Sequence, residues 1–296
     1  TVNIIDGEMK LFAQKEVVEE VQFPATEISV AEAQKYMPGA VEGDLVEVET
    51  KAKQFGRIAA QTAKGVIIQG IREAEREATY GRFTSKSHEM LTGTVLRIDP
   101  VNGGITVRIG TGSDKMDAYL SQSEQVPGEE WVEGDTIRVY VVDVRKSAHG
   151  AQMMVSRTHP GLVKRLFELE VPEISDGTVE IRSIAREAGS RTKLAVWASD
   201  PDIDPVGTCV GPRGGRVGAV VDELGGEKMD IIKYSEDPAE FVAAALSPAD
   251  VLQVVTYPGT KNCRVIVPDD QLSLAIGKEG QNARLAARLT GYKIDI

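Results

Sequence analysis

The last 21 residues of the chain, IGKEGQNARLAARLTGYKIDI (residues 276–296), decide the fold. The sequence Gly277 to Gly280 opens directly into an alanine-rich segment with apolar residues at helical spacing, and the stretch ends in the alternating run KIDI. Glycine supplies the positive φ that a tight turn between two helices needs. The pattern predicts a short helix, a glycine turn, a second helix and a strand.

The same unit occurs once more upstream. In DPVGTCVGPRGGRVGAVVDELGGEKMDII (residues 204–232), Gly211 and Gly214 align with Gly277 and Gly280, and after one extra residue KMDII aligns with KIDI. Two consecutive copies of one supersecondary unit indicate a tandem repeat.

Further elements precede the glycine turn in each copy. A strand-like run, TKLAVWAS (192–199) or CRVIVP (263–268), comes first in each. Upstream of these lie two helical segments, GLVKRLFELEVPEI (161–174) and DPAEFVAAALS (237–247), the second with an Asp-Pro start. We expect one helical segment to pack against each sheet, which gives two α+β domains.

Residues 88–156 read as an all-β module. Five short alternating runs are separated by turn residues, which predicts a small closed or nearly closed barrel. The runs are LTGTVLRID, GGITVRIG, MDAYLS, DTIRVYVVDV and AQMMVS. Small barrels can bind single-stranded nucleic acid through aromatics on one face, and whether this barrel does so stays open, because its few aromatics include at least one expected core residue. The candidate aromatic and cationic residues are Tyr119, Trp131, Tyr140, Arg97, Arg108 and Arg138.

Residues 1–84 differ from both modules. VEGDLVEVE (41–49) alternates like a strand, whereas FGRIAAQTAKGVIIQGIREAEREATYGRF (55–83) carries apolar residues near helical spacing. This predicts an α/β domain followed by a long amphipathic helix that connects it to the barrel. The helical positions are Phe55, Ile58, Ala59, Thr62, Val66 and Ile71.

The charge of the chain restricts how it can bind nucleic acid. The net charge is −11, and every region is acidic: 10 basic against 14 acidic residues in 1–84, 7 against 10 in 85–156, and 17 against 21 in 157–296. Proteins that bind phosphate non-specifically carry a basic face. Any nucleic-acid binding must therefore depend on backbone donors and a few placed cations.

Composition also restricts compartment and class. No run of about 18 apolar residues and no signal peptide occurs, so we expect no membrane insertion and a cytoplasmic location. Cys209 and Cys263 lie far apart without metal-ligand spacing, which argues against a zinc site and a disulfide framework.

The Gly-x-x-Gly turns suit anion binding. Such a turn exposes backbone N–H groups at a helix N-terminus, where the helix dipole also favours negative charge. One copy alone would favour a plain turn, but two copies in equivalent positions favour a binding role. Pro212 removes one donor and Glu279 opposes phosphate, so each loop should bind weakly and the pair should gain by avidity.

Enzyme classes find little support. The three histidines are scattered, and His159 before Pro160 reads as a helix cap. The acidic pairs Asp202/Asp204 and Asp269/Asp270 stand beside predicted helix starts, where capping explains them. There is no P-loop, no HExxH and no dinucleotide fingerprint. We therefore expect no catalytic residue, no metal and no cofactor.

Four motifs carry a family resemblance over nearly the whole chain. The helix FGRIAAQTAKGVIIQGIREAERE, the run VSRTHP (155–160), GGEKMDII and the final stretch resemble the NusA family of bacterial transcription elongation, termination and antitermination factors. The resemblance implies an N-terminal RNA polymerase-binding domain with a truncated start (1–84), an OB-fold barrel of the ribosomal S-one type (85–156), and two type II KH domains (157–234 and 235–296). From the same resemblance we expect no acidic repeats, of the kind found in some relatives, after the second KH domain.

The resemblance also implies a function. It describes a non-enzymatic monomer that binds RNA polymerase near the RNA exit and holds nascent single-stranded RNA, to modulate pausing, termination and, with other factors, antitermination. An RNA-processing or ribosome-associated factor built from the same modules is the alternative, but it needs a catalytic domain that residues 1–84 are too short to contain.

The KH resemblance assigns the RNA-binding residues. Glycines and backbone donors would hold phosphates, the cations would add charge-assisted contacts, and Gln281 and Asn282 would reach base edges. The assigned residues are Gly211, Pro212, Arg213, Gly214 and Arg216 in the first loop, and Gly277, Lys278, Glu279, Gly280, Gln281, Asn282 and Arg284 in the second.

Overall fold

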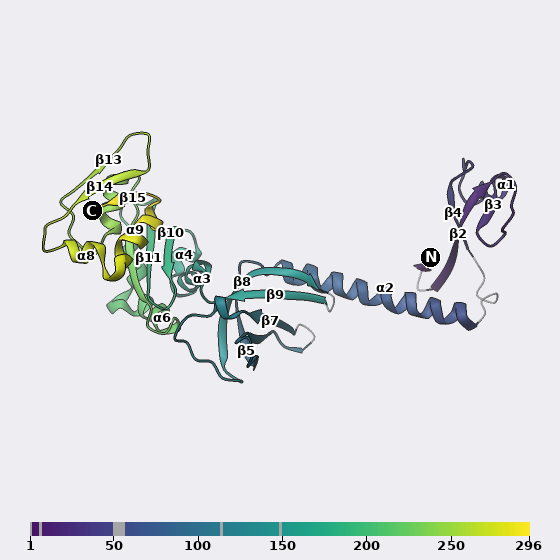
Figure 1. Cartoon of the computed structure of the whole chain (residues 1–296), viewed down its shortest axis with the longest axis horizontal. Helices are drawn as coiled ribbons and strands as arrows, with labels where there is room; N and C mark the ends of the chain where they lie inside the picture. The colour runs from purple at the N-terminus through teal and green to yellow at the C-terminus, as the bar shows by residue number, and fades with distance from the viewer. Residues whose placement is uncertain (1, 6–7, 50–56, 113–114, 148–149) are drawn as a thin grey trace. The chain divides into compact units, whose positions relative to one another are not determined.

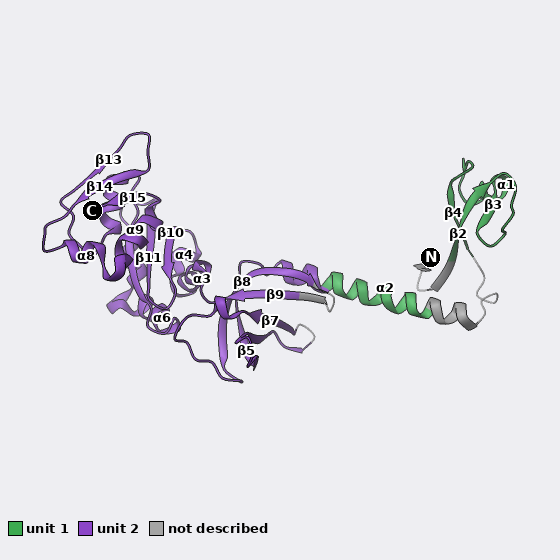
Figure 2. Ribbon diagram, in the orientation of Figure 1, with its two compact units in different colours: residues 1–78 green, residues 79–296 purple. Residues whose placement is uncertain are grey.

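The computed structural model describes residues 2–5, 8–49, 57–112, 115–147 and 150–296 (Figure 1). The chain divides into two compact units, Thr1–Ala78 and Thr79–Ile296 (Figure 2). The first unit holds the N-terminal domain and most of the long helix. The second holds the barrel and both KH domains, so these three modules form one body.

The N-terminal unit is a small mixed sheet with one short helix. Strand β2 is its centre, pairing antiparallel with β1 and β4 and parallel with β3. The predicted strand at 41–49 is confirmed in its second half, as β4. The elements are β1 (Val2–Ile5), β2 (Glu8–Val18), β3 (Glu27–Ser29), α1 (Val30–Ala33) and β4 (Leu45–Glu49). Its buried core residues are few: Val17, Ile28, Ala33, Ala40 and Val46.

The long helix predicted after this domain is α2 (Arg57–Thr84). Among the residues named for its apolar spacing, Phe55 and the side chains of Ile58, Ala59 and Thr62 lie outside the described part of the chain. At its C-terminal end, Tyr80 and Phe83 pack against the barrel core. The last turn of α2 therefore belongs to the barrel.

The five predicted barrel strands are confirmed, and the barrel is closed in the order β5-β6-β7-β9-β8. Gly93 is required where β5 meets β6, because a Cβ there would lie 2.7 Å from the carbonyl oxygen of Arg108. The strands are β5 (Met90–Ile98), β6 (Ile105–Ile109), β7 (Met116–Leu120), β8 (Thr136–Ser147) and β9 (Gly150–Ser156), with the 3₁₀ turn η3 (Gln122–Glu124) after β7.

Both KH domains have the element order α-β-β-α-α-β, which confirms the type II fold. In each sheet the central strand pairs antiparallel with the first strand and parallel with the last. The first domain comprises α3 (Pro160–Glu170), α4 (Pro172–Ser175), β10 (Val179–Glu187), β11 (Arg191–Ala198), α5 (Pro205–Val210), η4 (Pro212–Gly214), α6 (Gly215–Glu223) and β12 (Lys228–Lys233). The second comprises α7 (Pro238–Ala245), β13 (Gln253–Thr256), β14 (Asn262–Ile266), α8 (Leu272–Ile276), η5 (Lys278–Gly280), α9 (Gln281–Thr290) and β15 (Lys293–Asp295).

Most of the expected helix starts are found. Asp237 caps α7 by accepting from Ala239 N at 2.9 Å, Asp204 caps α5, and the Nδ1 atom of His159 accepts from Gly161 N at 2.9 Å at the start of α3. The capping role expected for Asp269/Asp270 is wrong: α8 begins after Gln271, without a side-chain cap.

The two KH domains share a layer of helices. One face of the β10-β11-β12 sheet packs on its own helices, α3, α5 and α6. The other face packs on α7 and α9 of the second domain, which also cover the β13-β14-β15 sheet. Because this layer of helices is buried between the two sheets, it is itself the contact between the two KH domains.

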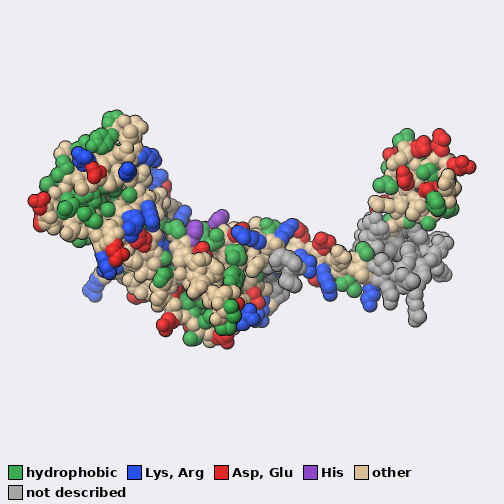
Figure 3. All heavy atoms as spheres, viewed as in Figure 1, with side chains coloured by type: hydrophobic (Ala, Val, Ile, Leu, Met, Phe, Trp, Pro, Cys, Tyr) green, Lys and Arg blue, Asp and Glu red, His purple; other side chains and the backbone are tan. Residues whose placement is uncertain are grey.

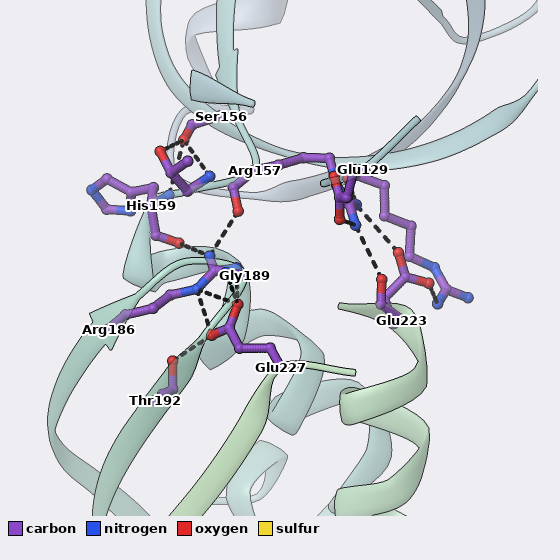
Figure 4. Close-up of polar contacts among 11 residues, drawn as sticks. Glu129, Ser156, Arg157, His159, Arg186, Gly189, Thr192, Glu223 and Glu227 are labelled. Atoms are coloured by element: carbon purple, nitrogen blue, oxygen red, sulfur yellow. Dashed lines mark hydrogen bonds and ion pairs between the residues drawn. The ribbon is translucent and has the colours of Figure 1, made fainter. Parts of the chain in front are cut away.

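A buried arginine joins the barrel to the first KH domain (Figure 4). Arg157 is 1% exposed, and its guanidinium donates to both carboxylate oxygens of Glu129, at 2.7 and 2.6 Å. It also donates to the carbonyl oxygen of Arg138 at 2.6 Å and to that of Glu223 at 3.0 Å. Its side chain lies over the ring of Trp131. Groups of both domains therefore accept hydrogen bonds from the Arg157 guanidinium and balance its charge, as a buried charge requires.

A second buried ion pair continues this junction (Figure 4). Arg186 Nη2 lies 2.9 Å from Glu227 Oε2, and both side chains are excluded from solvent. Thr192 Oγ1 and Gly189 N also donate to Glu227, and Arg186 Nη1 donates to the carbonyl oxygen of Arg157 at 2.7 Å. The two networks are therefore linked through the Arg157 backbone.

We predict that Arg157→Met destabilises the chain by about 3–5 kcal/mol, because it leaves the Glu129 carboxylate buried without its cation. Chemical denaturation followed by circular dichroism measures this free energy of unfolding. The matched control, Arg108→Met, removes an exposed barrel arginine paired with Asp117 and should cost less than about 1 kcal/mol. Equal losses in both variants would mean that the junction does not depend on Arg157.

Candidate nucleic-acid interface

The two Gly-x-x-Gly loops have the same backbone conformation. Gly211 and Gly277 have φ/ψ of 73°/173° and 74°/172°. The third residues, Arg213 and Glu279, have φ/ψ of 54°/27° and 53°/26°. Both closing glycines have φ/ψ of 75°/14° and precede α6 or α9. The aligned sequences therefore build two equivalent turns at equivalent places.

The two glycines of each loop are required for different reasons. A Cβ on Gly277 would lie 2.8 Å from the backbone nitrogen of Asn282, and a Cβ on Gly211 would lie 2.6 Å from the Cγ atom of Arg216. The closing glycines need a positive φ, but a Cβ on Gly214 would meet nothing within 4 Å. The first glycine allows close packing against the helix, and the second leaves open space beside the loop.

Backbone donors differ between the loops. Gly214 N and Gly280 N donate to the carbonyl oxygen of the first glycine of their own loop, each at 3.1 Å. The two central residues of the loop stand at the start of the helical turn. At this position no carbonyl of an earlier turn is available to accept from their N–H groups. Pro212 has no N–H, so the second loop offers one donor more than the first.

In the first loop, Arg213 and Arg216 play different parts. Arg213 is exposed, and no residue in the described part of the chain pairs with its guanidinium. Arg216 instead donates to Glu173 Oε2 at 2.9 Å and to the carbonyl oxygen of Thr208 at 2.8 Å. Its charge is therefore partly neutralised and it fixes the loop to α5.

In the second loop, the cations divide in the same way. Lys278 is exposed, whereas Arg284 donates to the carbonyl oxygen of Glu279 at 3.1 Å and to Glu187 Oε1 at 2.6 Å. Gln281 Nε2 donates to Glu187 Oε2 at 2.9 Å and to Ser190 Oγ at 2.7 Å. These two side chains hold the second loop against the first KH domain.

The expectation that the Asn282 amide reaches base edges does not fit its position. Asn282 is 2% exposed, and its Nδ2 atom donates to the carbonyl oxygens of Leu246 at 2.9 Å and Ala275 at 3.1 Å. The side chain ties α9 to α7 and α8. The sequence alone does not show that the Asn282 amide is buried, because Gln281 and Asn282 follow the same closing glycine and nothing in the pattern distinguishes them.

Glu187, which the sequence did not single out, joins β10 of the first KH domain to α9 of the second. The hydrogen bond from Arg284 lowers the pKa of Glu187 to about 2, and the hydrogen bond from Gln281 contributes a smaller part of this effect. Arg288 Nη1 also lies 3.8 Å from Glu187 Oε1. The ionised carboxylate is therefore stabilised by three side chains of α9.

An apolar surface lies beside the second loop. Leu272, Leu274 and Ile276 of α8 are 40%, 43% and 39% exposed. On the face that Figure 3 shows, acidic and basic side chains are interleaved over the KH domains. Apolar contacts and backbone donors are therefore more prominent here than bulk positive charge.

The barrel residues named as RNA-contact candidates are largely engaged within the protein. Tyr140 is buried and stacks on His159 with ring centroids 4.6 Å apart, which confirms that one barrel aromatic belongs to the core. Arg138 pairs with Glu223 at 2.6 Å and Arg108 with Asp117 at 3.1 Å.

None of the helices in the described part of the chain is both long and apolar enough to cross a membrane. Among the same residues, no group of three or more His, Cys, Asp or Glu side chains is arranged to hold a metal ion.

Four family profiles match consecutive parts of the chain. The NusA N-terminal domain matches residues 1–77, the S1 RNA binding domain residues 84–156, the NusA-like first KH domain residues 157–234, and the NusA-like second KH domain residues 238–296. The fold and its matched domains define a class of protein: one that combines an S1 barrel with a tandem pair of KH domains.

Similar proteins identify the family within this class. The transcription termination/antitermination protein NusA of Bacillus subtilis is 56% identical over 290 residues, which cover 98% of this chain and 76% of that protein. The NusA of Thermus thermophilus is 44% identical over 97% of this chain and 73% of that protein. A solution structure of the N-terminal domain of B. subtilis NusA is 51% identical over 26% of this chain and 61% of that chain, with a TM-score of 0.17. The chain belongs to the NusA family of transcription termination/antitermination proteins.

We predict that Glu187→Gln removes a pH-dependent part of the stability. Because the folded-state pKa of Glu187 lies below its usual 4.5, its stabilising contribution is complete above about pH 4.5 and is lost as pH falls toward 2. The difference in melting temperature between wild type and variant should therefore shrink from pH 6 to pH 3. Glu180→Gln, which removes an exposed carboxylate of the same strand paired with Arg182, is the control. A pH-independent difference for Glu187→Gln would contradict the assignment.

Proposed function

We propose that this chain acts in transcription by binding nascent single-stranded RNA through its two Gly-x-x-Gly loops and RNA polymerase through its N-terminal unit. It modulates pausing, termination and antitermination in this way and carries out no reaction of its own. Membership of the NusA family supports the transcriptional role. The observation that carries the RNA proposal is the equal backbone conformation of the two loops in one packed body.

The geometry supports different roles for different residues of each loop. The open side beside Gly214 leaves room for a phosphate to approach the backbone donors, and beside Gly280 a Cβ would come no closer than 3.9 Å to Arg284 Nη1. Arg213 and Lys278 are exposed beside these donors and supply charge-assisted contacts. Bases would lie on the apolar surface of α8. Arg216, Gln281, Arg284 and Asn282 support the loops and need not touch RNA.

The fixed relation between the loops supports avidity. Glu187 joins the first KH domain to α9, and α7 and α9 are buried between the two sheets. The second loop therefore lies at a set separation from the first. RNA held by one loop meets the other at high effective concentration, which compensates for the acidic surroundings.

The N-terminal unit supports a protein-binding role. Its small core leaves Phe23, Val41 and Leu45 64%, 61% and 64% exposed. We infer that these exposed apolar side chains contribute to a surface that binds another protein. RNA polymerase is the partner that family membership suggests.

The first test is RNA titration of the full chain at two salt concentrations, with a short unstructured RNA and its duplex. We expect single-strand preference and a shallow salt slope. Arg213→Asp, and Lys278→Asp combined with Glu279→Asp, should each weaken RNA binding roughly tenfold, with the fold unchanged. Lys64→Asp, an exposed cation on α2, should have no effect. Unchanged affinity in both loop variants would assign RNA binding elsewhere.

The second test concerns polymerase. A fragment of residues 1–84 should compete with the full chain for purified RNA polymerase in a pull-down. In the full chain, Phe23→Ser with Leu45→Ser should weaken polymerase binding roughly tenfold and leave RNA affinity unchanged. Val132→Ser, at an exposed apolar residue of the barrel, is the matched control. Full polymerase binding by the double variant would place the docking surface outside these residues.

A further inference from the structure

The outer face of the first KH sheet, on the side away from α3, α5 and α6, is covered by helices. Ala185, Ala195 and Ile232 on this face are 3%, 0% and 3% exposed and pack in one core with α7 and α9. Helix α9 crosses β10 and β11, and α7 lies beside β12. In the first KH domain, a pair of helices that turn apolar residues toward the sheet therefore occupies this face.

The same face carries an ion pair that the helices also cover. Lys193 Nζ lies 2.9 Å from Asp230 Oδ2, and the Lys193 side chain is fully buried. The ammonium donates to the carbonyl oxygen of Ser247, just past the C-terminal end of α7, at 2.7 Å. A helix end thus supplies the acceptor that a buried cation needs.

The second KH sheet repeats this face, strand by strand. Val255 pairs with Arg264 as Ala185 pairs with Lys193. Arg264 in turn pairs with Asp295, as Lys193 pairs with Asp230, and Arg264 Nη2 lies 3.0 Å from Asp295 Oδ2. Ile266, two residues beyond Arg264, takes the place of Ala195.

Here, however, the described residues leave the face open. Val255 and Ile266 are 37% and 42% exposed, and the Arg264 and Asp295 side chains are 61% and 68% exposed. Alternate residues Cys263 and Val265 point the other way, into the shared core. The outer face of the second KH sheet is therefore exposed, although it has the same strand register as the helix-covered face of the first.

We propose that the outer face of the second KH sheet is a docking surface for an amphipathic helix of a partner protein, seated as α9 is seated on the first sheet. A carbonyl at the C-terminal end of the partner helix is the acceptor for Arg264, as the carbonyl of Ser247 is for Lys193.

The charge of the face favours a protein over RNA. Asp295 lies against Arg264 and neutralises it, so the pair offers phosphate no net attraction. The Gly-x-x-Gly loop joins α8 to α9, and α9 packs on the opposite face of the sheet. The docking surface and the proposed RNA loop are therefore separate.

The probe is a peptide with the sequence of residues 279–292, which contains α9, made helical by a side-chain cross-link between positions 284 and 288. Its helicity is verified by circular dichroism. Added to the isotopically labelled full chain, it should shift the amide resonances of β13 and β14 and leave those of β10 and β11 unchanged, because the first face is already filled. Ile266→Glu and the milder Ile266→Ala should weaken peptide binding, the former at least roughly tenfold.

The matched control is Val101→Glu, which adds the same charge at a barrel residue that is 92% exposed. It should bind the peptide like wild type. No shifts at β13 and β14 with a helical peptide, or equal weakening by Val101→Glu, would overturn the proposal. A loss of RNA affinity in Arg264→Glu without peptide binding would make the face an RNA surface, and self-association abolished by Ile266→Glu would make it a dimer contact. Either result would also overturn it.

Discussion

Burial of the Arg157 guanidinium between two domains is the interaction on which the larger unit depends. A buried cation must find carboxylates and carbonyls in fixed directions, and Glu129 of the barrel and Glu223 of the first KH domain provide them. Apolar contacts alone would allow the domains to slide, whereas a forked ion pair has one good geometry. The carbonyl of Arg157 then accepts from Arg186, so the backbone at the domain boundary is held from both sides.

The acidic composition and an RNA-binding role are compatible because the loops rely on conformation more than on bulk charge. Glycines at the ends of each loop set the turn, and the helix that follows supplies dipole and donors. Most of the nearby cations serve the protein itself: Arg216 is paired with Glu173 and Arg284 with Glu187. Charge counting by region therefore says little about such a site, since its donors are backbone groups that carry no formal charge.

Much of the fold was predictable, because the glycine loops and alternating strands are local patterns. Strand β10 was missed, since its alternation is interrupted by a register shift between Ile181 and Ser183, and β13 is only four residues long. The loop glycines were assigned from sequence, but the engagement of Asn282 and Arg284 was not. Their partners, Leu246 and Glu187, lie 36 and 97 residues away in sequence, and only the packing of the two KH domains brings them together.

The helix layer shared by the two KH sheets restricts how the repeat can evolve. In an array of separate domains, a substitution in one copy is tested against one core. Here Leu285, Ala286 and Leu289 of α9 belong to a core that also contains Ala185 and Ala195 of the other copy. A change of volume at these positions must suit both neighbours at once. Substitutions in the two copies are therefore expected to be accepted together rather than independently.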